Sequence, residues 1–214
     1  MTDRTVYTFN PYTILDSLGT ENSDLFIPAP AEPDEGWPRI ASPGTFGWDE
    51  EDYLRVANAL HQRVWGESLD NWELIYAYFD ILQCTDIVDN IDDVAISFYR
   101  RVNGLDNVHG FWLQPLKGIA TAGYGYNSDI GKAIDLPNMK VNNLDSALMI
   151  SEGVGGKEVR TMLKDGDCYV SALFAPYVLH GYFNSFDWGW RIYYGPNFGV
   201  EIDPYTAEYK IMTQ

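Results

Sequence analysis

The chain has 214 residues, of which 46% are hydrophobic and 21% are charged. These proportions are typical of a globular domain and exclude a disordered or fibrous protein, and this length is sufficient for one large core. Acidic residues outnumber basic residues by 31 to 14, which gives a formal net charge of −17 at pH 7. Such a charge repels phosphate groups, so we expect no direct binding to nucleic acid and no binding to an anionic membrane surface.

Prolines and glycines interrupt residues 1–47, where six prolines occur. Because proline breaks helices and central strands, the sequence predicts an extended proline-rich arm here. Apolar residues such as Trp37 and Ile40 would let this arm dock on the body of its own domain or on a neighbouring subunit. Residues 48–214 are expected to form a single α+β domain.

Three helices are expected to follow the arm. The first begins at an N-cap, Asp49, and ends at Gly66, with apolar residues at helical spacing between them. The second and third, over residues 70–82 and 85–104, show a similar apolar period of three to four residues. The sequence therefore predicts a three-helix segment ahead of the sheet.

The second half of the chain is predicted to be mainly antiparallel sheet, because aromatic and β-branched runs alternate there with glycine, proline and asparagine. The predicted strands cover residues 108–114, 168–175, 188–194, 198–202 and 207–212. One short helix is expected near residues 156–164. Turn signals at Gly195-Pro196-Asn197 and at Asp203-Pro204 predict a meander of the last three strands.

The two cysteines, Cys84 and Cys168, are too few for a disulfide framework. The first residues of the chain lack the basic and apolar regions of a secretory signal. We therefore expect synthesis in a reducing cytoplasm and no secretion by a signal peptide. No apolar run approaches the roughly 20 residues of a membrane-spanning helix.

Acidic residues gather at the start of the third predicted helix. Asp86, Asp89 and Asp93 are spaced so that on a helix their carboxylates would share a face and could hold Mg²⁺. This pattern resembles the aspartate-rich helix of isoprenoid synthases, a family that needs a large helical body and a second acidic motif. Because acidic side chains also stabilise the positive end of a helix dipole, we favour that role and predict no metal and no cofactor.

The residues around Cys168 resemble the nucleophile motif of ovarian-tumour-type cysteine proteases, with Asp165-Gly166-Asp167 before the cysteine and Tyr169-Val170-Ser171 after it. A catalytic thiolate would need a histidine base, for which the candidates are His180 and His109. That family has its histidine far downstream, whereas no histidine follows His180 here. A buried structural cysteine is the favoured interpretation, and a cysteine hydrolase using Cys168 is an alternative.

The C-terminal part of the chain, residues 165–209, resembles the C-terminal strand region of tailed-phage major capsid proteins. The resemblance rests on Phe174-Ala175-Pro176-Tyr177-Val178, on Arg191-Ile192-Tyr193-Tyr194-Gly195 and on the turn at Asp203-Pro204. Leu179 stands where the family has a second proline. The resemblance implies a strand meander and a place in a virion.

The leading expectation is a non-enzymatic structural or assembly protein, a viral (phage) virion component that acts by self-association. Its partners would be other copies of itself or other assembly subunits. The net charge motivates an alternative, an acidic inhibitor that mimics nucleic acid and occupies the basic site of a host enzyme. That alternative requires a basic protein partner.

Overall fold

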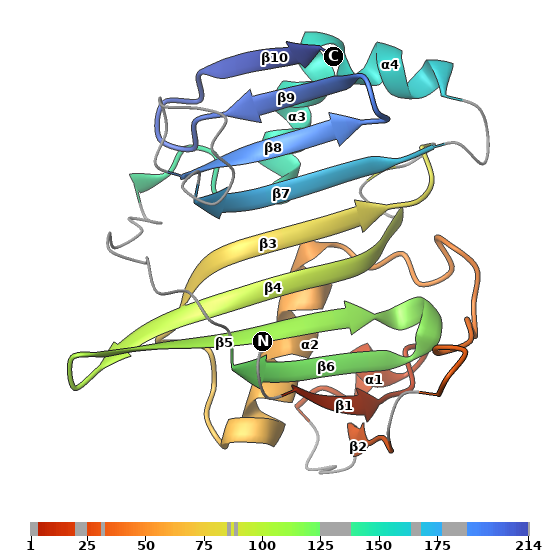
Figure 1. Ribbon diagram of the computed structural model, residues 1–214, viewed down its shortest axis with the longest axis vertical. Helices are drawn as coiled ribbons and strands as arrows, with labels where there is room; N and C mark the ends of the chain where they lie inside the picture. The colour runs from red at the N-terminus through yellow and green to blue at the C-terminus, as the bar shows by residue number, and fades with distance from the viewer. Residues whose placement is uncertain are drawn as a thin grey trace.

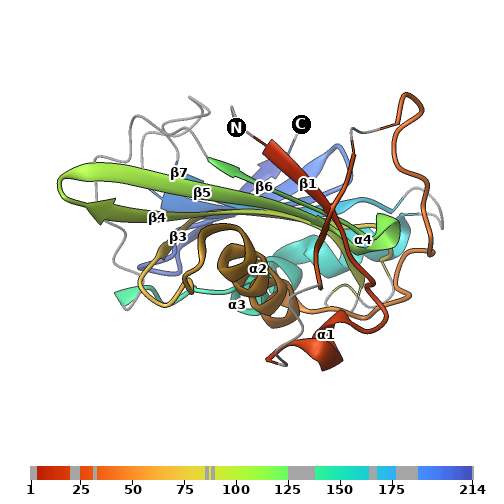
Figure 2. The same cartoon turned by 90° about the horizontal axis from the view of Figure 1, so that it is seen from below.

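One sheet with helices on one side forms the body of the protein (Figures 1 and 2). The computed structural model describes residues 4–19, 25–30, 33–84, 87, 90–124, 138–163, 168–176 and 188–213. The strands are β1 (Arg4–Thr8), β2 (Ile27–Pro28), β3 (Glu73–Ile81), β4 (Ile91–Val102), β5 (Leu105–Gln114), β6 (Ile119–Tyr124), β7 (Val170–Pro176), β8 (Trp188–Tyr194), β9 (Phe198–Ile202) and β10 (Tyr209–Thr213). The helical elements are α1 (Ile14–Ser17), α2 (Glu50–Trp65), η2 (Pro115–Lys117), α3 (Leu144–Ser151), η4 (Glu152–Gly156) and α4 (Lys157–Met162).

The ten strands run in the order β10-β9-β8-β7-β3-β4-β5-β6-β1-β2, and every pair among them is antiparallel. The predicted α+β class with a mainly antiparallel sheet is therefore confirmed. The predicted strands 188–194 and 198–202 have these bounds in the structure, and β8, β9 and β10 form the expected meander. The short helix predicted near residues 156–164 is α4.

The order of elements occurs twice along the chain. Helix α2 precedes the meander β3-β4-β5-β6, and helices α3 and α4 precede the meander β7-β8-β9-β10. The first strands of the two meanders, β3 and β7, pair with each other at the centre of the sheet. Helix α2 packs against β5 and β6, and α3 packs against β8 and β9 (Figure 2). The protein thus consists of two helix-and-meander units whose strand orders are related by a two-fold axis perpendicular to the sheet.

Helix α2 has the predicted boundaries because both of its ends are capped. Asp49 Oδ1 accepts a hydrogen bond of 2.9 Å from the backbone N–H of Asp52. Gly66 adopts the left-handed conformation with φ of 75° and donates its N–H to the carbonyl of Gln62 at 2.9 Å. The face that α2 turns to the sheet contains Tyr53, Val56, Ala57 and Leu60, which are fully buried.

The other two predicted helices, at residues 70–82 and 85–104, are wrong where the structure describes them. Residues 73–81 form β3 and residues 91–102 form β4. In β3 the buried residues Ile75, Ala77, Phe79 and Ile81 alternate with partly exposed ones, which is the period of a strand. Aromatic and β-branched residues at these positions favour a strand, and they also happen to satisfy a helical spacing.

The described part of the proline-rich arm lies on the protein's own sheet. Strand β1 pairs with β6, in register from Arg4 opposite Gly123 to Thr8 opposite Ile119. After β1, apolar side chains of this segment enter the core beside α2; they are Phe9, Ile14 and Phe26. This segment therefore contributes both an outer strand and core packing to its own domain.

The main core fills the space between the sheet and the helices. Its largest fully buried side chains include Trp190, Tyr53, Tyr194, Phe26, Phe79, Phe111 and Phe174. In the described part of the chain, no helix combines the length and the apolar character needed to span a bilayer.

Candidate functional site

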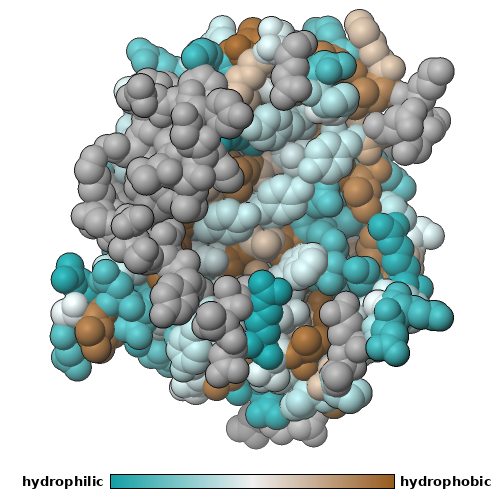
Figure 3. Space-filling model, in the orientation of Figure 1, coloured by the Kyte–Doolittle hydropathy of each residue, from teal (hydrophilic) through white to brown (hydrophobic). Residues whose placement is uncertain are grey.

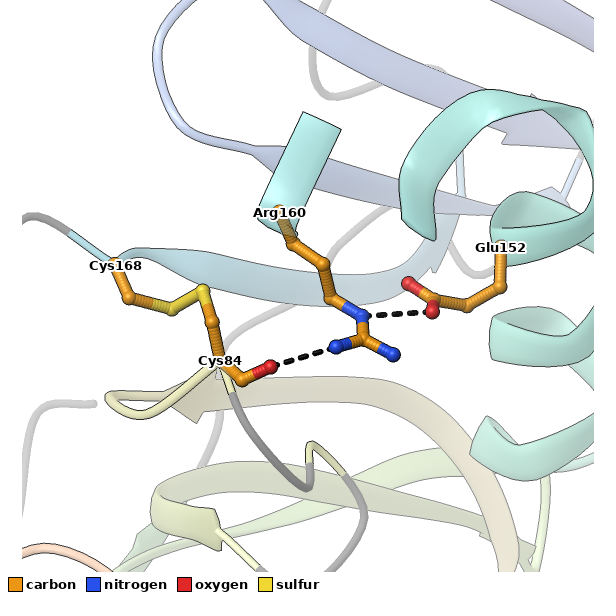
Figure 4. Close-up of a disulfide and its surroundings, with 4 residues drawn as sticks. All are labelled: Cys84, Glu152, Arg160 and Cys168. Atoms are coloured by element: carbon orange, nitrogen blue, oxygen red, sulfur yellow. Dashed lines mark hydrogen bonds and ion pairs between the residues drawn. A yellow bond between two sulfur atoms is a disulfide. The ribbon is translucent and has the colours of Figure 1, made fainter. Parts of the chain in front are cut away.

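Cys84 and Cys168 form a disulfide that connects the two units (Figure 4). Cys84 follows β3 and Cys168 precedes β7, and their Cα atoms are 5.6 Å apart, a typical separation for this bond. Two cysteines are too few for a disulfide framework, but these two are paired with each other. Disulfides persist in oxidising surroundings, which include secreted proteins and virion surfaces, so this bond does not fit the reducing compartment that the cysteine count suggested.

Arg160 of α4 lies beside the disulfide and forms hydrogen bonds with two neighbouring segments (Figure 4). Its Nε donates to Glu152 Oε2 at 2.7 Å, and its Nη1 donates to the backbone carbonyl of Cys84 at 2.7 Å. The side chains of Arg160 and Glu152 are 14% and 17% exposed, so solvent screens this ion pair little. The arrangement positions the helices of the second unit against the end of β3 in the first.

The structure does not bring Cys168 together with a histidine base. In the ladder His109 lies level with Leu74 of β3, whereas Cys168 lies beyond Ile81 of the same strand. Seven residues of extended strand separate these levels, roughly 23 Å at about 3.3 Å per residue. Cys168 is also bonded to Cys84, so it offers no thiolate while the disulfide is intact. The remaining candidates, His180, Asp165 and Asp167, lie outside the described residues.

The predicted metal ligands are not assembled by a helix. Asp86 and Asp89 lie outside the described residues, and Asp93 belongs to strand β4. Asp93 Oδ2 accepts a hydrogen bond of 3.0 Å from Gln114 Nε2, and burial raises the pKa of this carboxyl group. Among the residues that the structure describes, no three histidine, cysteine, aspartate or glutamate side chains are grouped as a metal site requires.

Two histidines that are far apart in the sequence form a hydrogen bond with each other between α2 and β5. His61 Nε2 lies 2.9 Å from His109 Nδ1, and His61 Nδ1 lies 2.7 Å from the backbone carbonyl oxygen of Glu67. Because a carbonyl oxygen only accepts, His61 Nδ1 carries the proton and His61 Nε2 accepts from His109 Nδ1–H. In the neutral pair, His109 Nε2 is therefore the nitrogen without a proton.

Tryptophans enclose this histidine pair. The ring of Trp65 stacks on His109 with 3.9 Å between centroids and 12° between planes, and Trp72 lies 4.2 Å from His109. His61 and His109 are buried, and burial lowers the pKa of His109 to about 4 and lowers that of His61. A histidine with so low a pKa is a weak base at pH 7, so the pair belongs to the packing between helix and sheet.

The histidine pair predicts a specific dependence of stability on pH. The folded-state pKa of both histidines lies below the ordinary value near 6.5, so below that pH the unfolded chain binds more protons than the folded chain. Their contribution to the free energy of unfolding is present above about pH 6.5 and is lost progressively as the pH falls to about 4. For His109 the loss amounts to roughly 3 kcal/mol, at about 1.4 kcal/mol per unit of pKa.

The variant His109→Gln isolates this contribution, since glutamine can still donate to His61 but cannot titrate in this range. Urea unfolding at pH 7 and pH 4.5 should show a smaller loss of stability in the variant than in the wild type. Burial raises the pKa of Glu50 to about 7 and that of Asp92 to about 6, which stabilises the folded state on acidification. Glu50→Gln should therefore shift the pH dependence in the opposite direction. Equal pH dependence of wild type and His109→Gln would contradict this assignment.

A buried ion pair lies on the side of the sheet opposite the histidine pair. Arg191 of β8 and Glu201 of β9 are register partners, with 3.1 Å between Arg191 Nε and Glu201 Oε1. Their side chains are 6% and 0% exposed. Tyr194 of β8 bonds to Ser151 of α3 and thus faces the helices, so Arg191, three residues earlier on the strand, faces away from them.

Figure 3 shows the sheet face opposite the helices, and strands β3 and β5 contribute aromatic side chains to this face. Tyr78 of β3 and Trp112 of β5 are both register partners of Ala95 in the strand between them. The hydroxyl oxygens of Tyr78 and Tyr169 lie 2.8 Å apart, and Trp112 and Tyr169 are 40% and 41% exposed. The sequence predicted strands at Trp112 and Tyr169 but a helix at Tyr78, and it did not show which of these rings would reach solvent.

The fold and these sites define an α+β protein made of two helix-and-meander units that are joined through β3 and β7 and by a disulfide. Comparison with models of protein families, with curated proteins and with solved structures finds no match to this chain.

Proposed function

We propose that the protein is a non-enzymatic assembly protein that associates with other copies of itself through an edge of its sheet. The observation that carries this proposal is the outer edge of β10, which in the described part of the chain pairs with β9 alone. Tyr209 and Ile211 of this strand are 52% and 43% exposed. An exposed edge strand offers its backbone N–H and C=O groups to another strand.

Strand β10 is compatible with antiparallel pairing to a second copy of itself. In a register centred on Ile211, Tyr209 lies opposite Thr213 and Lys210 lies opposite Met212. No like charges face each other in this register, and Lys210 has Glu201 as its partner in the neighbouring strand of its own chain. Two sheets would merge across a two-fold axis, which is the most common symmetry of protein dimers.

The catalytic alternative has less support, because Cys168 is bonded to Cys84 and lies far from His109. The inhibitor alternative depended on acidic helices, whereas Asp92 and Asp93 belong to a strand and Asp92 is buried. A virion is one assembly built from self-associating subunits, and the resemblance of residues 165–209 to tailed-phage capsid proteins supports that form of the proposal.

The variant Ile211→Lys tests the edge. We expect sedimentation equilibrium to show a dimer for the wild type and an increase of about tenfold or more in the dissociation constant for the variant, since a charge enters an apolar contact. Each copy carries a net charge of −17, so raising the ionic strength should strengthen the wild-type dimer.

Leu105→Lys is the matched control, because Leu105 of β5 is 71% exposed and β5 lies six strands from β10 in the sheet. This variant should associate like the wild type. A wild-type protein that stays monomeric at high protein concentration and about 0.5 M salt would refute the proposal. Equal weakening by the two variants would show that β10 is not the contact.

A further inference from the structure

The aromatic side chains opposite the helices flank a small residue. Ala95 of β4 lies between Tyr78 of β3 and Trp112 of β5 on one rung of the sheet. Neighbouring strands are about 4.8 Å apart, so the backbones that carry the two rings are about 9.6 Å apart. A flat group stacked between two rings needs about 7 Å between the ring planes, at 3.5 Å for each contact. Between the two aromatic residues, Ala95 contributes only a methyl group.

Two carboxylates occupy the next rung on the same face. Asp80 of β3 and Asp93 of β4 are direct register partners, and Asp93 is a diagonal neighbour of Trp112, at about 7–8 Å between backbones. Burial and the adjacent charge of Asp93 raise the pKa of Asp80. Within the described residues, Asp80 Oδ1 is buried and accepts no hydrogen bond. Asp93 Oδ2 accepts from Gln114 Nε2, so it is Asp80 Oδ1 that lacks a donor among the described residues.

The charges of the surrounding residues leave the group negative. Three carboxyl groups lie near this rung, those of Asp80, Asp92 and Asp93. The positive charge of the exposed Arg39 lowers the pKa of all three, and that of Lys117 lowers the pKa of Asp93. Three carboxylates thus stand against two cations. The net charge of −17 adds a long-range attraction for a positively charged partner.

We propose that Tyr78, Trp112, Asp80 and Asp93 form a binding site for the arginine or lysine side chain of a basic protein partner. The cationic head group lies over Ala95 between the two rings and donates hydrogen bonds to the carboxylates. Aromatic faces attract cations, and a guanidinium group suits this position best because it is flat and carries five donors. The chain contains this contact elsewhere, since Arg100 lies 4.6 Å from the ring centroid of Trp72.

This site lies on the central strands and does not include β10, so it goes beyond the proposed self-association and can succeed or fail independently of it. The test is calorimetric titration of the full chain with an alanine-based peptide that contains three arginines. A second peptide replaces each arginine by citrulline, which has nearly the same shape and no charge. We expect the arginine peptide to bind at least about tenfold more tightly than the citrulline peptide.

Two pairs of variants locate the binding. Trp112→Ala and Asp80→Asn should each weaken binding of the arginine peptide by about fivefold or more. Glu158→Gln on α4 also removes one exposed negative charge, and Tyr124→Ala on β6, whose ring lies beside Trp65 of α2 and is 50% exposed, also removes one exposed aromatic ring. Both controls should stay within about twofold of the wild type.

Folding of the variants does not limit the test, because Trp112 is 40% exposed and Asp80→Asn removes a repulsion between neighbouring strands. Equal affinity for the two peptides would overturn the proposal. Equal weakening by all four variants would also overturn it, since binding would then reflect only the overall charge of the protein.

Discussion

Replacing Glu201 by leucine is expected to lower the free energy of unfolding by about 3–5 kcal/mol. Glu201 is 0% exposed and pairs with Arg191, whose side chain is 6% exposed. The substitution leaves the guanidinium group of Arg191 buried without this counter-charge, so Glu201 no longer offsets the desolvation of that charge. Urea unfolding monitored by far-ultraviolet circular dichroism measures the loss.

Replacing both partners separates the cost of removing this counter-charge from the value of the pair. The double variant Arg191→Met with Glu201→Leu should recover most of the stability, because two apolar side chains of similar volume can fill the site. The exposed pair Arg55–Asp52 is the matched control, with side chains 47% and 23% exposed. Arg55→Met should cost less than about 1 kcal/mol. If Glu201→Leu cost no more than Arg55→Met, the buried pair would not be a strong structural element.

The parts of the fold that could be predicted from the sequence are those with a local signal. Asp49 caps α2 and Gly66 ends it, and both act on backbone groups within four residues. The turn at Gly195-Pro196-Asn197 fixes the boundary between β8 and β9 in the same local way. These elements were predicted correctly because the information lies within one turn or one hairpin.

Strands β3 and β4 could not be predicted in this way, because their apolar residues satisfy two periods at once. In β4, for example, Val94 and Phe98 are four residues apart, yet Ile96 between them is also buried. These residues form a strand because their backbone pairs with the neighbouring strands: β4 pairs with both β3 and β5. That pairing is a long-range property and leaves no local signal.

The candidate sites depend on contacts between distant parts of the chain. His61 and His109 are 48 residues apart in sequence, and Cys84 and Cys168 are separated by 84. One signal for the first pair is present, since His61 follows Ala57 by four residues and thus continues the buried face of α2. No spacing rule identifies its partner on β5. The disulfide likewise requires the pairing of β3 with β7, which brings the two cysteines to one end of the sheet.

The disulfide carries the second large prediction. Substitution of Cys84 and Cys168 by serine is expected to lower the free energy of unfolding by about 2–4.5 kcal/mol. The upper value follows from the loss of loop-closure entropy in the unfolded chain for a separation of 84 residues. Chemical denaturation of the wild type with and without a reducing agent should reproduce the difference, and the double variant should not respond to the reducing agent.

The same bond should control how the two units come apart. The described contacts between them include the five residue pairs of β3 and β7 and the disulfide. Two hydrogen bonds of 2.7 Å add to these, one from the backbone N–H of Leu144 to Glu50 Oε2 and one from Arg160 Nη1 to the carbonyl of Cys84. On reduction, we expect amide hydrogen exchange to accelerate in β3 and β7 more than in α2, because the constraint is lost at that junction. Uniform acceleration across both units would mean that the sheet opens as one cooperative body. A selective change would show that each helix-and-meander unit keeps its own packing while the junction loosens.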